Sequence, residues 1–216
     1  MFTVDLHTHT RFFHGFEGEP TRFDPIGANL SALYGQWRGL DGLALTNHDY
    51  YADFEVIPER LQFIPGVEIT TTQGHALVVG PDPPTRTAPG ELTPQEVVTL
   101  AHNAGCAAII AHPYRRSNIR KSGADFDAVE INGKHPGNID QIQKLADSLD
   151  LPIVGGSDAH FPFEVGRVFT TIDADVLTPE SVVAAIRAEQ VEPYVRDDFL
   201  NRTIQTGYRY VHKYLQ

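Results

Sequence analysis

The chain has 216 residues, of which 41% are hydrophobic, and a formal net charge of −11. This length and apolar content are typical of one domain with a sizeable core, so we expect a single domain over residues 1–216. The negative charge argues against broad binding to polymeric nucleic acid or to anionic membranes.

The N-terminal sequence has no basic-then-apolar leader pattern, and no apolar run is long enough to span a bilayer. A cytoplasmic protein is therefore expected. The single cysteine, Cys106, lies within an apolar run, which is typical of a buried and unreactive thiol.

Short apolar, β-branched runs predict a series of strands. In chain order they are residues 2–7, 42–46, 62–69, 75–79, 107–112, 128–131, 153–155 and 168–172. Between many of them lie helical patterns, at residues 25–37, 93–103, 136–149 and 179–190. Repeated alternation of strand and helix predicts a parallel sheet.

The C-terminal segment predicts one more helix. Within residues 196–216, an apolar stripe at helical spacing indicates a C-terminal helix packed on the parent domain, with a dimer contact as the alternative. The stripe consists of Phe199 or Leu200, Ile204, Tyr208, Val211 and Leu215. The oligomeric state, monomer or dimer, stays open.

Polar residues stand at or just past the C-terminal ends of six predicted strands. They are His7, His48, Glu68, His112, Glu130 and Asp158. Doubly wound sheets also alternate strand and helix, but a barrel brings this many strand ends to one mouth. We therefore predict a TIM-like (β/α) barrel with fewer than eight units and a site at the strand C-termini.

The motif "DLHTHT" places His7 and His9 at the end of the first predicted strand. Residues i and i+2 of a strand face the same side, about 6–7 Å apart, so both imidazoles can reach one metal ion. Asp158 and His160 in "GGSDAH" have the same spacing. The alternative is that His7 and His9 are ordinary histidines that bind no metal. It is less favoured because seven of the ten histidines lie at strand ends or in adjacent loops.

The ordered motifs "DLHTHT", "TNHD", "GVEI", "GHALVVG", "AHP" and "SDAH" resemble the PHP (polymerase and histidinol phosphatase) family of metal-dependent phosphoesterases. The resemblance covers residues 5–160 and implies a distorted (β/α)7 barrel with a trinuclear metal centre. It implies one ion on His7, His9, Glu68 and Asp158, a second on Glu68, His75 and His112, and a third on His14, His48 and His160.

Position 47 departs from the family pattern. The family usually has Thr-Asp-His where this chain has Thr46-Asn47-His48, so the expected carboxylate at position 47 is missing. Asp49, two residues further on, is the candidate substitute. Loops at residues 10–24, 81–93 and 114–123 are expected to cover the site.

The resemblance implies hydrolysis of a phosphate ester. Two to three divalent ions would lower the pKa of a bound water towards about 7 and so create a hydroxide, held by Glu68, His112 and Asp158. A ligand set rich in imidazole suits Zn, Mn or Fe. Arg115 and Arg116 are the candidate phosphate-binding residues, with Arg11 and Arg167 as weaker ones.

Our interpretation is a phosphatase acting on a small-molecule phosphomonoester, whose leaving group stays open among histidinol phosphate, a nucleoside monophosphate and a sugar phosphate. Three alternatives remain. The first is a nuclease-type phosphodiesterase on short oligonucleotides. The second is an amidohydrolase-type metal hydrolase, and the third is a structural or regulatory metal module.

Overall fold

A computed structural model of the chain describes residues 1–10, 25–52, 61–115, 117–197 and 201–203. The strands are β1 (Phe2–Thr8), β2 (Gly42–Leu45), β3 (Gln62–Thr71), β4 (Gly74–Val79), β5 (Ala107–Ile110), β6 (Ala128–Asn132), β7 (Ile153–Gly156), β8 (Val168–Ile172) and β9 (Val191–Val195). The helices are α1 (Pro25–Trp37), α2 (Pro94–Asn103), α3 (Ile139–Leu149) and α4 (Pro179–Arg187), with short 3-10 turns η1 (Ile119–Lys121), η2 (Pro136–Asn138) and η3 (Pro162–Glu164).

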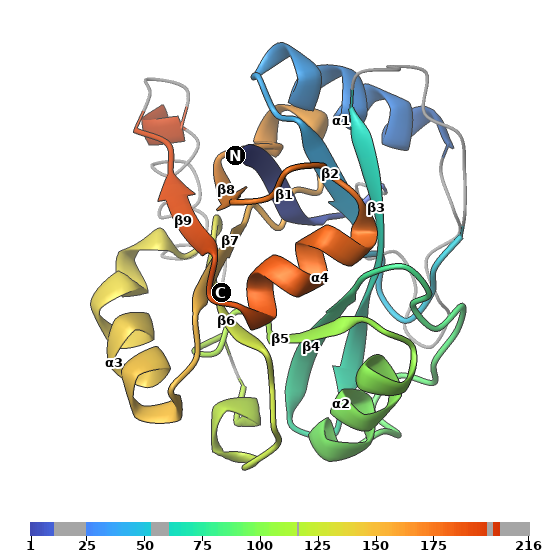
Figure 1. Cartoon of the computed structure of the whole chain (residues 1–216), viewed down its shortest axis with the longest axis vertical. Coiled ribbons are helices and arrows are strands. Elements are labelled where there is room, and N and C mark those ends of the chain that lie inside the picture. Colours follow the sequence, from blue (N-terminus) through green and yellow to red (C-terminus); the bar gives the residue numbers. More distant parts are fainter. Residues whose placement is uncertain (11–24, 53–60, 116, 198–200, 204–216) are drawn as a thin grey trace.

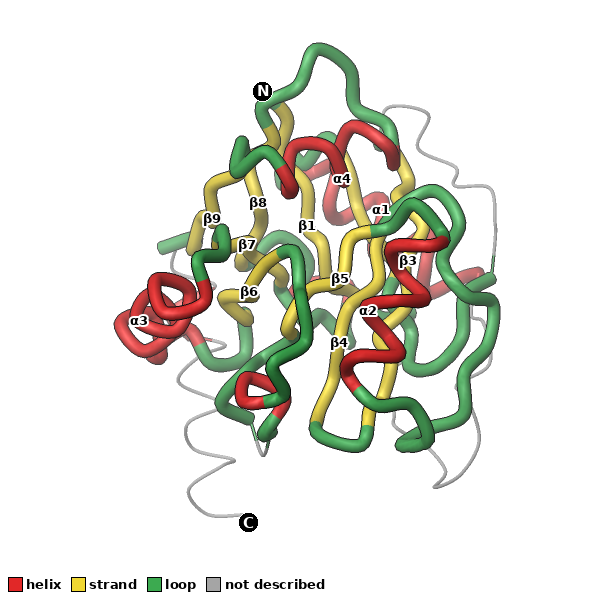
Figure 2. The backbone as a smooth tube through the Cα atoms, turned by 60° about the horizontal axis from the view of Figure 1, so that its bottom comes forward, coloured by secondary structure: helices red, strands yellow, loops and turns green. Residues whose placement is uncertain are grey.

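The strands form one curled sheet in the order β7-β6-β5-β4-β3-β2-β1-β8-β9 (Figures 1 and 2). The sheet nearly closes on itself, because Thr8 of β1 bridges to Ala159 just after β7. Gly155 of β7 also donates its backbone N–H to the hydroxyl of Thr170 in β8, over 2.8 Å. The predicted single-domain α/β barrel is thereby confirmed as a nearly closed, barrel-shaped sheet.

The sheet is mixed, so the prediction of a parallel sheet is wrong in part. β1–β2, β2–β3, β5–β6 and β6–β7 pair in parallel, whereas β3–β4, β4–β5, β1–β8 and β8–β9 pair antiparallel. The cause at β3–β4 is a tight hairpin in place of a helical crossover. Its turn needs Gly74, whose φ is 140° and where a Cβ would lie 2.1 Å from the hydroxyl of Ser117. Antiparallel pairing sets the beginning of β4 beside the end of β3.

Two apolar layers hold the barrel. The inner layer fills the barrel with the inward-facing side chains of β1 to β8 and is completed by Val182, Val183, Ala185 and Ile186 of α4, which lies across the strands in Figure 1. The outer layer packs α2 and α3 on the outside of the sheet. Side chains alternate along each strand between these two layers. A polar residue that faces inward near the C-terminal end of its strand therefore lies at the barrel mouth.

The predicted helices at 25–37, 93–103, 136–149 and 179–190 correspond to α1 to α4, with η2 as the first turn of the third. Strand β9 was not predicted. Of the predicted C-terminal helix at 196–216, Asn201 to Thr203 are helical and the rest, beyond residues 196 and 197, lies outside the described residues. None of the described helices has the length and apolar character needed to cross a bilayer.

Candidate metal centre

The carboxylate of Glu68, at the C-terminal part of β3, is the centre of a buried group of histidines. Its Oε2 lies 3.2 Å from each of three ring nitrogens, His7 Nε2, His9 Nε2 and His48 Nδ1. Its Oε1 lies 2.7 Å from His75 Nδ1 and 2.9 Å from His112 Nε2. The two oxygens of one carboxylate therefore face two different sets of imidazoles.

An irregularity in β1 brings His7 and His9 into the barrel. Where β1 pairs with β2, Asp5 lies opposite Leu43 and Thr8 lies opposite Leu45. Between these two pairs β1 therefore has one more residue than β2. One extra residue reverses the alternation of side chains. The inner layer can thus use Val4 and Leu6 before the irregularity, and His7 and His9 can face inward after it.

The ring of His7 is held by Glu130 of β6, which is fully buried. Glu130 Oε1 accepts a hydrogen bond from His7 Nδ1 over 2.6 Å, and its Oε2 accepts the backbone N–H of His112 over 2.8 Å. This approach requires Gly156, because a Cβ there would lie 2.5 Å from the Cβ of His7 and 2.6 Å from Glu130 Oε1. Glu130 therefore turns His7 Nε2 towards Glu68.

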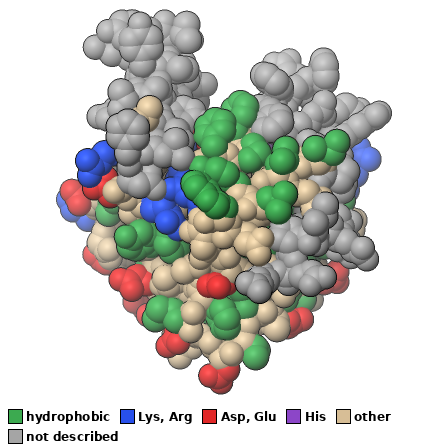
Figure 3. All heavy atoms as spheres, turned by 90° about the horizontal axis from the view of Figure 1, so that it is seen from above, with side chains coloured by type: hydrophobic (Ala, Val, Ile, Leu, Met, Phe, Trp, Pro, Cys, Tyr) green, Lys and Arg blue, Asp and Glu red, His purple; other side chains and the backbone are tan. Residues whose placement is uncertain are grey.

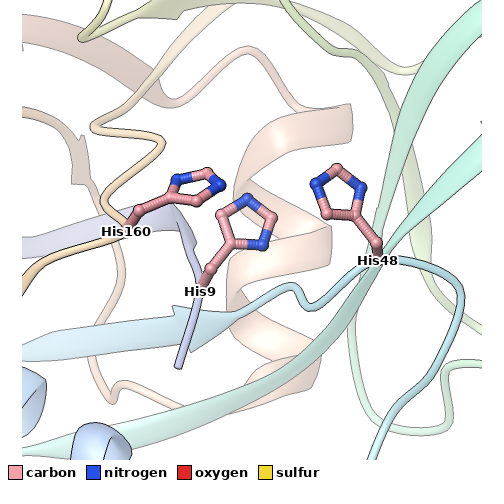
Figure 4. A group of neighbouring side chains, drawn as sticks. All are labelled: His9, His48 and His160. Carbon is pink, nitrogen blue, oxygen red and sulfur yellow. The ribbon is translucent and has the colours of Figure 1, made fainter. Parts of the chain in front are cut away.

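A second group of rings lies beside the first. His9, His48 and His160 point towards one another from three different segments (Figure 4). The ring centroid of His9 lies 4.7 Å from that of His48 and 4.4 Å from that of His160. The ligand atoms of these three residues all lie within 4.8 Å of one another, as do those of His7, His9 and Asp158 and those of His48, Glu68 and His75.

Asp158, just past β7, is surrounded by donors. Its Oδ1 lies 3.3 Å from His9 Nε2 and 3.1 Å from Lys134 Nζ. Its Oδ2 lies 3.3 Å from Arg115 Nη1 and 3.3 Å from the amide of Asn132. The backbone of Asp158 has a φ of 52°, a left-handed conformation that non-glycine residues seldom adopt and that often occurs at functional sites.

The electrostatics of the centre follow from its buried carboxylates. Burial alone would raise the pKa of Glu68, but His48, His7 and His75 outweigh it and hold the pKa well below its usual range. Burial would likewise raise the pKa of Asp158, which Lys134 and His7 instead hold well below its usual range. Both acids are therefore ionised at neutral pH.

The same carboxylates act in the opposite sense on two histidines. Burial would lower the pKa of His7, but Glu130, Glu68 and Asp158 raise it well above its ordinary value. For His75, burial again lowers the pKa, and the adjacent Glu68 outweighs it and raises the pKa. In both cases the buried negative charge favours the protonated form of the ring.

The donor atoms fit a transition-metal centre. Because His7 donates from Nδ1, a neutral His7 presents a lone pair at Nε2, which lies 3.2 Å from both His9 Nε2 and Glu68 Oε2. Acceptors at such distances repel unless a proton or a cation lies between them. Ligands held by bonds of about 2.0 Å in a tetrahedron would be about 3.3 Å apart. The buried Nδ1 of His112 also has no hydrogen-bond partner among the described residues.

Of the predicted ligands, the structure brings eight to one place. They are His7, His9, His48, Glu68, His75, His112, Asp158 and His160. The ninth, His14, lies outside the described residues, as do Arg11 and Arg116. Arg167 is fully buried, where its Nε donates to Asn201 over 2.6 Å, so the expectation that it contacts substrate has no support.

The departure at position 47 has a structural role of its own. Asn47 accepts the backbone N–H of Thr10 over 3.0 Å, which fastens the chain just after His9 to the end of β2. Asp49 does not take the place of a carboxylate at position 47. It instead accepts hydrogen bonds from Thr70 and Thr87, and burial raises its pKa.

A cavity of about 570 Å³ opens beside the centre. One side is formed by candidate ligands, and the other by Pro113, Tyr114 and Ile142 together with polar side chains. Its lining consists of His48, Glu68, Gly74, His75, His112, Pro113, Tyr114, Arg115, Asn132, His135, Asn138, Ile142 and Asp158. Arg115 reaches it because the turn after β5 is closed by its backbone N–H, which donates to the carbonyl of His112 over 2.9 Å.

Sequence reasoning placed Glu130 at the barrel mouth but gave it no task there, and it did not single out Lys134 or Asn132. Glu130 did carry a signal, since it is a carboxylate inside an apolar strand, where an acid is seldom fully buried without a partner. Lys134 reaches Asp158 through a local turn in which its backbone N–H donates to the side chain of Asn132 over 3.0 Å. The sequence "EINGK" alone does not reveal this turn.

The fold and the site together define a barrel with a candidate metal centre at the strand ends. Residues 138–191 match the family model described as PHP-associated. No curated protein matches the chain in sequence. The PHP-associated match supports the resemblance to the PHP family that the motifs carry.

Several solved structures share the fold. PsfC from Pseudomonas syringae has a TM-score of 0.75 and 17% identity, covering 99% of this chain and 98% of PsfC. A two-domain protein from Bacteroides vulgatus, containing a predicted PHP-like metal-dependent phosphoesterase, has a TM-score of 0.64 and 17% identity over 90% of this chain and 65% of that protein. Endonuclease Q, in complex with a duplex substrate carrying an abasic lesion, has a TM-score of 0.63 and 17% identity, covering 87% of this chain and 56% of Endonuclease Q.

An amidohydrolase from Chromobacterium violaceum also shares the fold, with a TM-score of 0.55 and 18% identity over 88% of this chain and 97% of that protein. At these identities the likeness establishes the fold. The neighbours differ in activity, so the fold alone does not select the reaction.

Proposed function

We propose that this protein is a metal-dependent phosphoesterase that hydrolyses a phosphomonoester of a small molecule. The observation that carries the proposal is the convergence of six histidines on the buried Glu68 and Asp158, beside a cavity with a basic side chain in its wall. The PHP-associated family match and the PHP-like neighbour support the same reaction class.

Two to three divalent ions of Zn, Mn or Fe fit the donor set, since imidazole with carboxylate suits these metals. Within the proposal, Glu68, His112 and Asp158 would hold the ions that activate the attacking water. His75, His7, His9, His48 and His160 are the remaining ligands, with His14 as the proposed ninth. When bound, such ions would lower the pKa of a coordinated water and neutralise charge on the phosphoryl oxygens.

The chain's own side chains orient this set. Glu130 fixes the tautomer of His7 by accepting its Nδ1–H, and an acceptor of this kind raises the basicity of the ligand nitrogen. Asn132 links Glu130 to Asp158, over 3.2 Å and 3.3 Å. Glu130 and Asn132 therefore hold the ligands in place.

Arg115 is the proposed phosphate-binding residue. Its side chain lines the cavity, and its Nη1 lies 3.3 Å from Asp158. A guanidinium can donate two parallel hydrogen bonds to a phosphate. Lys134, on another side of Asp158, adds a second positive charge close by. Arg116 stays a proposed partner of Arg115.

The shape of the site favours a small substrate. A volume of about 570 Å³ is within the range of small-molecule sites, roughly 300–1,000 Å³. The net charge of −11 opposes the approach of a polyanion, whereas the local cluster of cations attracts a single phosphate group. We propose a cytoplasmic enzyme with no membrane partner, in line with the net charge of −11, which disfavours anionic membrane surfaces.

The test begins with elemental analysis of protein purified without chelator, with His7→Ala as the control. It continues with a panel of metabolite phosphates, scored by released inorganic phosphate with Mn and Zn supplied separately. We expect bound transition metal and release of phosphate, both strongly reduced in His7→Ala. Protein that binds no transition metal under these conditions would overturn the proposal.

Two alternatives from the same fold are separated by substrate. A phosphodiesterase would cut short oligonucleotides in a gel assay, as the likeness to Endonuclease Q suggests. An amidohydrolase would act on amides or lactones. Activity confined to either of these substrates would replace the phosphomonoesterase assignment.

A further inference from the structure

Helix α1 presents large apolar side chains to solvent. The exposed fractions are 73% for Ile26, 47% for Leu30, 46% for Leu33 and 75% for Trp37. Among residues 26–37 of the helix, these four are the exposed ones. Figure 3 looks down on the end of the molecule where Figure 1 shows α1, and hydrophobic side chains gather on that face.

The buried face of α1 consists of small residues. They are Gly27, Ala28, Ser31, Ala32 and Gly35. Ala28 and Ala32 pack with Leu43 and Leu45 of β2 in a separate apolar cluster. A helix that only covered its own barrel would turn its large apolar side chains inward and its polar ones outward. This helix does the reverse.

The spacing of the exposed residues has its own symmetry. Successive members are four, three and four residues apart, which is the spacing of a seam between two packed helices. The order four-three-four is the same when read from either end. If two such helices pack antiparallel about a two-fold axis, Ile26 faces the partner's Trp37 and Leu30 faces the partner's Leu33.

We propose that α1 is the contact face of a symmetric dimer of this chain, in which two copies of the helix pack antiparallel. A two-fold axis requires one surface to be complementary to itself, and a stripe that reads the same in both directions meets that requirement. The proposal concerns assembly and is independent of the metal centre and its reaction.

Charge favours a second copy over a foreign partner. Helix α1 contains no charged residue, so pairing two copies sets no like charges opposite one another although each chain carries −11. The four side chains expose on the order of 500 Å² in each copy, so pairing would bury about 1,000 Å², near the lower limit for a specific interface. A dimer of moderate affinity is therefore expected.

The oligomeric state tests the proposal. Light scattering on metal-loaded, full-length protein at increasing concentration should show a dimer. Changing Leu30→Glu together with Leu33→Glu should raise the dimer dissociation constant at least 100-fold, because four carboxylates would meet at the axis. The control, Val176→Glu, alters an exposed apolar residue outside α1 and should leave the dimer intact.

A second measurement does not depend on how well the charged variant folds. A mixture of the single variants Leu30→Cys and Leu33→Cys should cross-link under mild oxidation faster than either variant alone, because the antiparallel register opposes residue 30 to residue 33. The native Cys106 is buried.

Three outcomes would overturn the proposal: wild-type protein that stays monomeric at 100 µM or so, a double glutamate variant that still dimerises, and cross-linking that is no faster in the mixture. A monomeric wild type whose stability falls in the double glutamate variant would show instead that the chain's own segments cover this face.

Discussion

Glu130 is the most informative residue to change, because both of its oxygens act as acceptors in a site where it is not itself a proposed ligand. Oε1 accepts from His7 Nδ1 over 2.6 Å and Oε2 accepts from the backbone of His112 over 2.8 Å. In Glu130→Gln, one acceptor becomes an amide donor while the shape is kept. If the new amide group faces the backbone N–H of His112, two donors oppose each other. If it faces His7, it favours the tautomer that carries its proton on Nε2.

The magnitude follows from these contacts. A hydrogen bond to a charged group contributes about 1.5–3 kcal/mol, and a buried donor left without an acceptor costs about 1–3 kcal/mol. Loss of an acceptor that orients a metal-bound histidine lowers metal affinity about 10- to 100-fold. We therefore expect Glu130→Gln to bind metal about 10- to 100-fold more weakly and to remain folded.

The assay is competition against a chelator of known affinity, read by elemental analysis of the protein fraction. Circular dichroism on heating checks the fold. Glu192→Gln, which makes the same change at an exposed position of β9, is the matched control and should bind metal as the wild type does. If Glu130→Gln and the control bind metal equally well, the argument that Glu130 orients His7 is refuted.

Three other predictions follow from the same geometry. Lys134→Met removes the cation 3.1 Å from Asp158, so thermal unfolding should show a larger loss of stability in metal-free than in metal-loaded protein, and equal losses would contradict this. Arg115→Ala should lower kcat/KM for phosphate release at least 10-fold with little change in melting temperature, and an unchanged kcat/KM would contradict its role. The raised pKa of His7 and His75 implies that metal uptake displaces protons, so metal affinity should fall as pH falls. Calorimetry in two buffers of different ionisation enthalpy measures that release, and equal heats would contradict it.

The candidate site was predictable to the extent that it depends on strand ends. The C-terminal ends of strands that run in the same direction meet at one edge of a sheet, so Glu68, His112 and Asp158 could be expected together from their places in the sequence. His75 is different, since it stands at the beginning of its strand. Only the antiparallel pairing of β3 with β4, set by the turn at Gly74, puts it within 2.7 Å of Glu68.

The features that sequence reasoning missed depend on local irregularity or on contacts between distant segments. The extra residue in β1 has no composition signal, yet it decides that His7 faces inward. Helix α1 was predicted within its observed bounds, but not its orientation. Nothing in a pattern with apolar residues on both faces indicates that the small ones are buried and the large ones exposed.

The arrangement around Glu68 explains why the site demands so much of the fold. Two ionised carboxylates, Glu68 and Asp158, are buried at a barrel mouth, where neither would be stable without positive charge close by. In the described structure Lys134 and Arg115 each lie beside an oxygen of Asp158, and the imidazole of His7 lies 3.2 Å from an oxygen of Glu68. Divalent ions would supply the same compensation with fewer ordered side chains, and would free the basic side chains to meet an anionic substrate. If the proposed ions bind, they would displace protons from the imidazoles, and Arg115 and Lys134 could then exchange a contact with Asp158 for a contact with a phosphate.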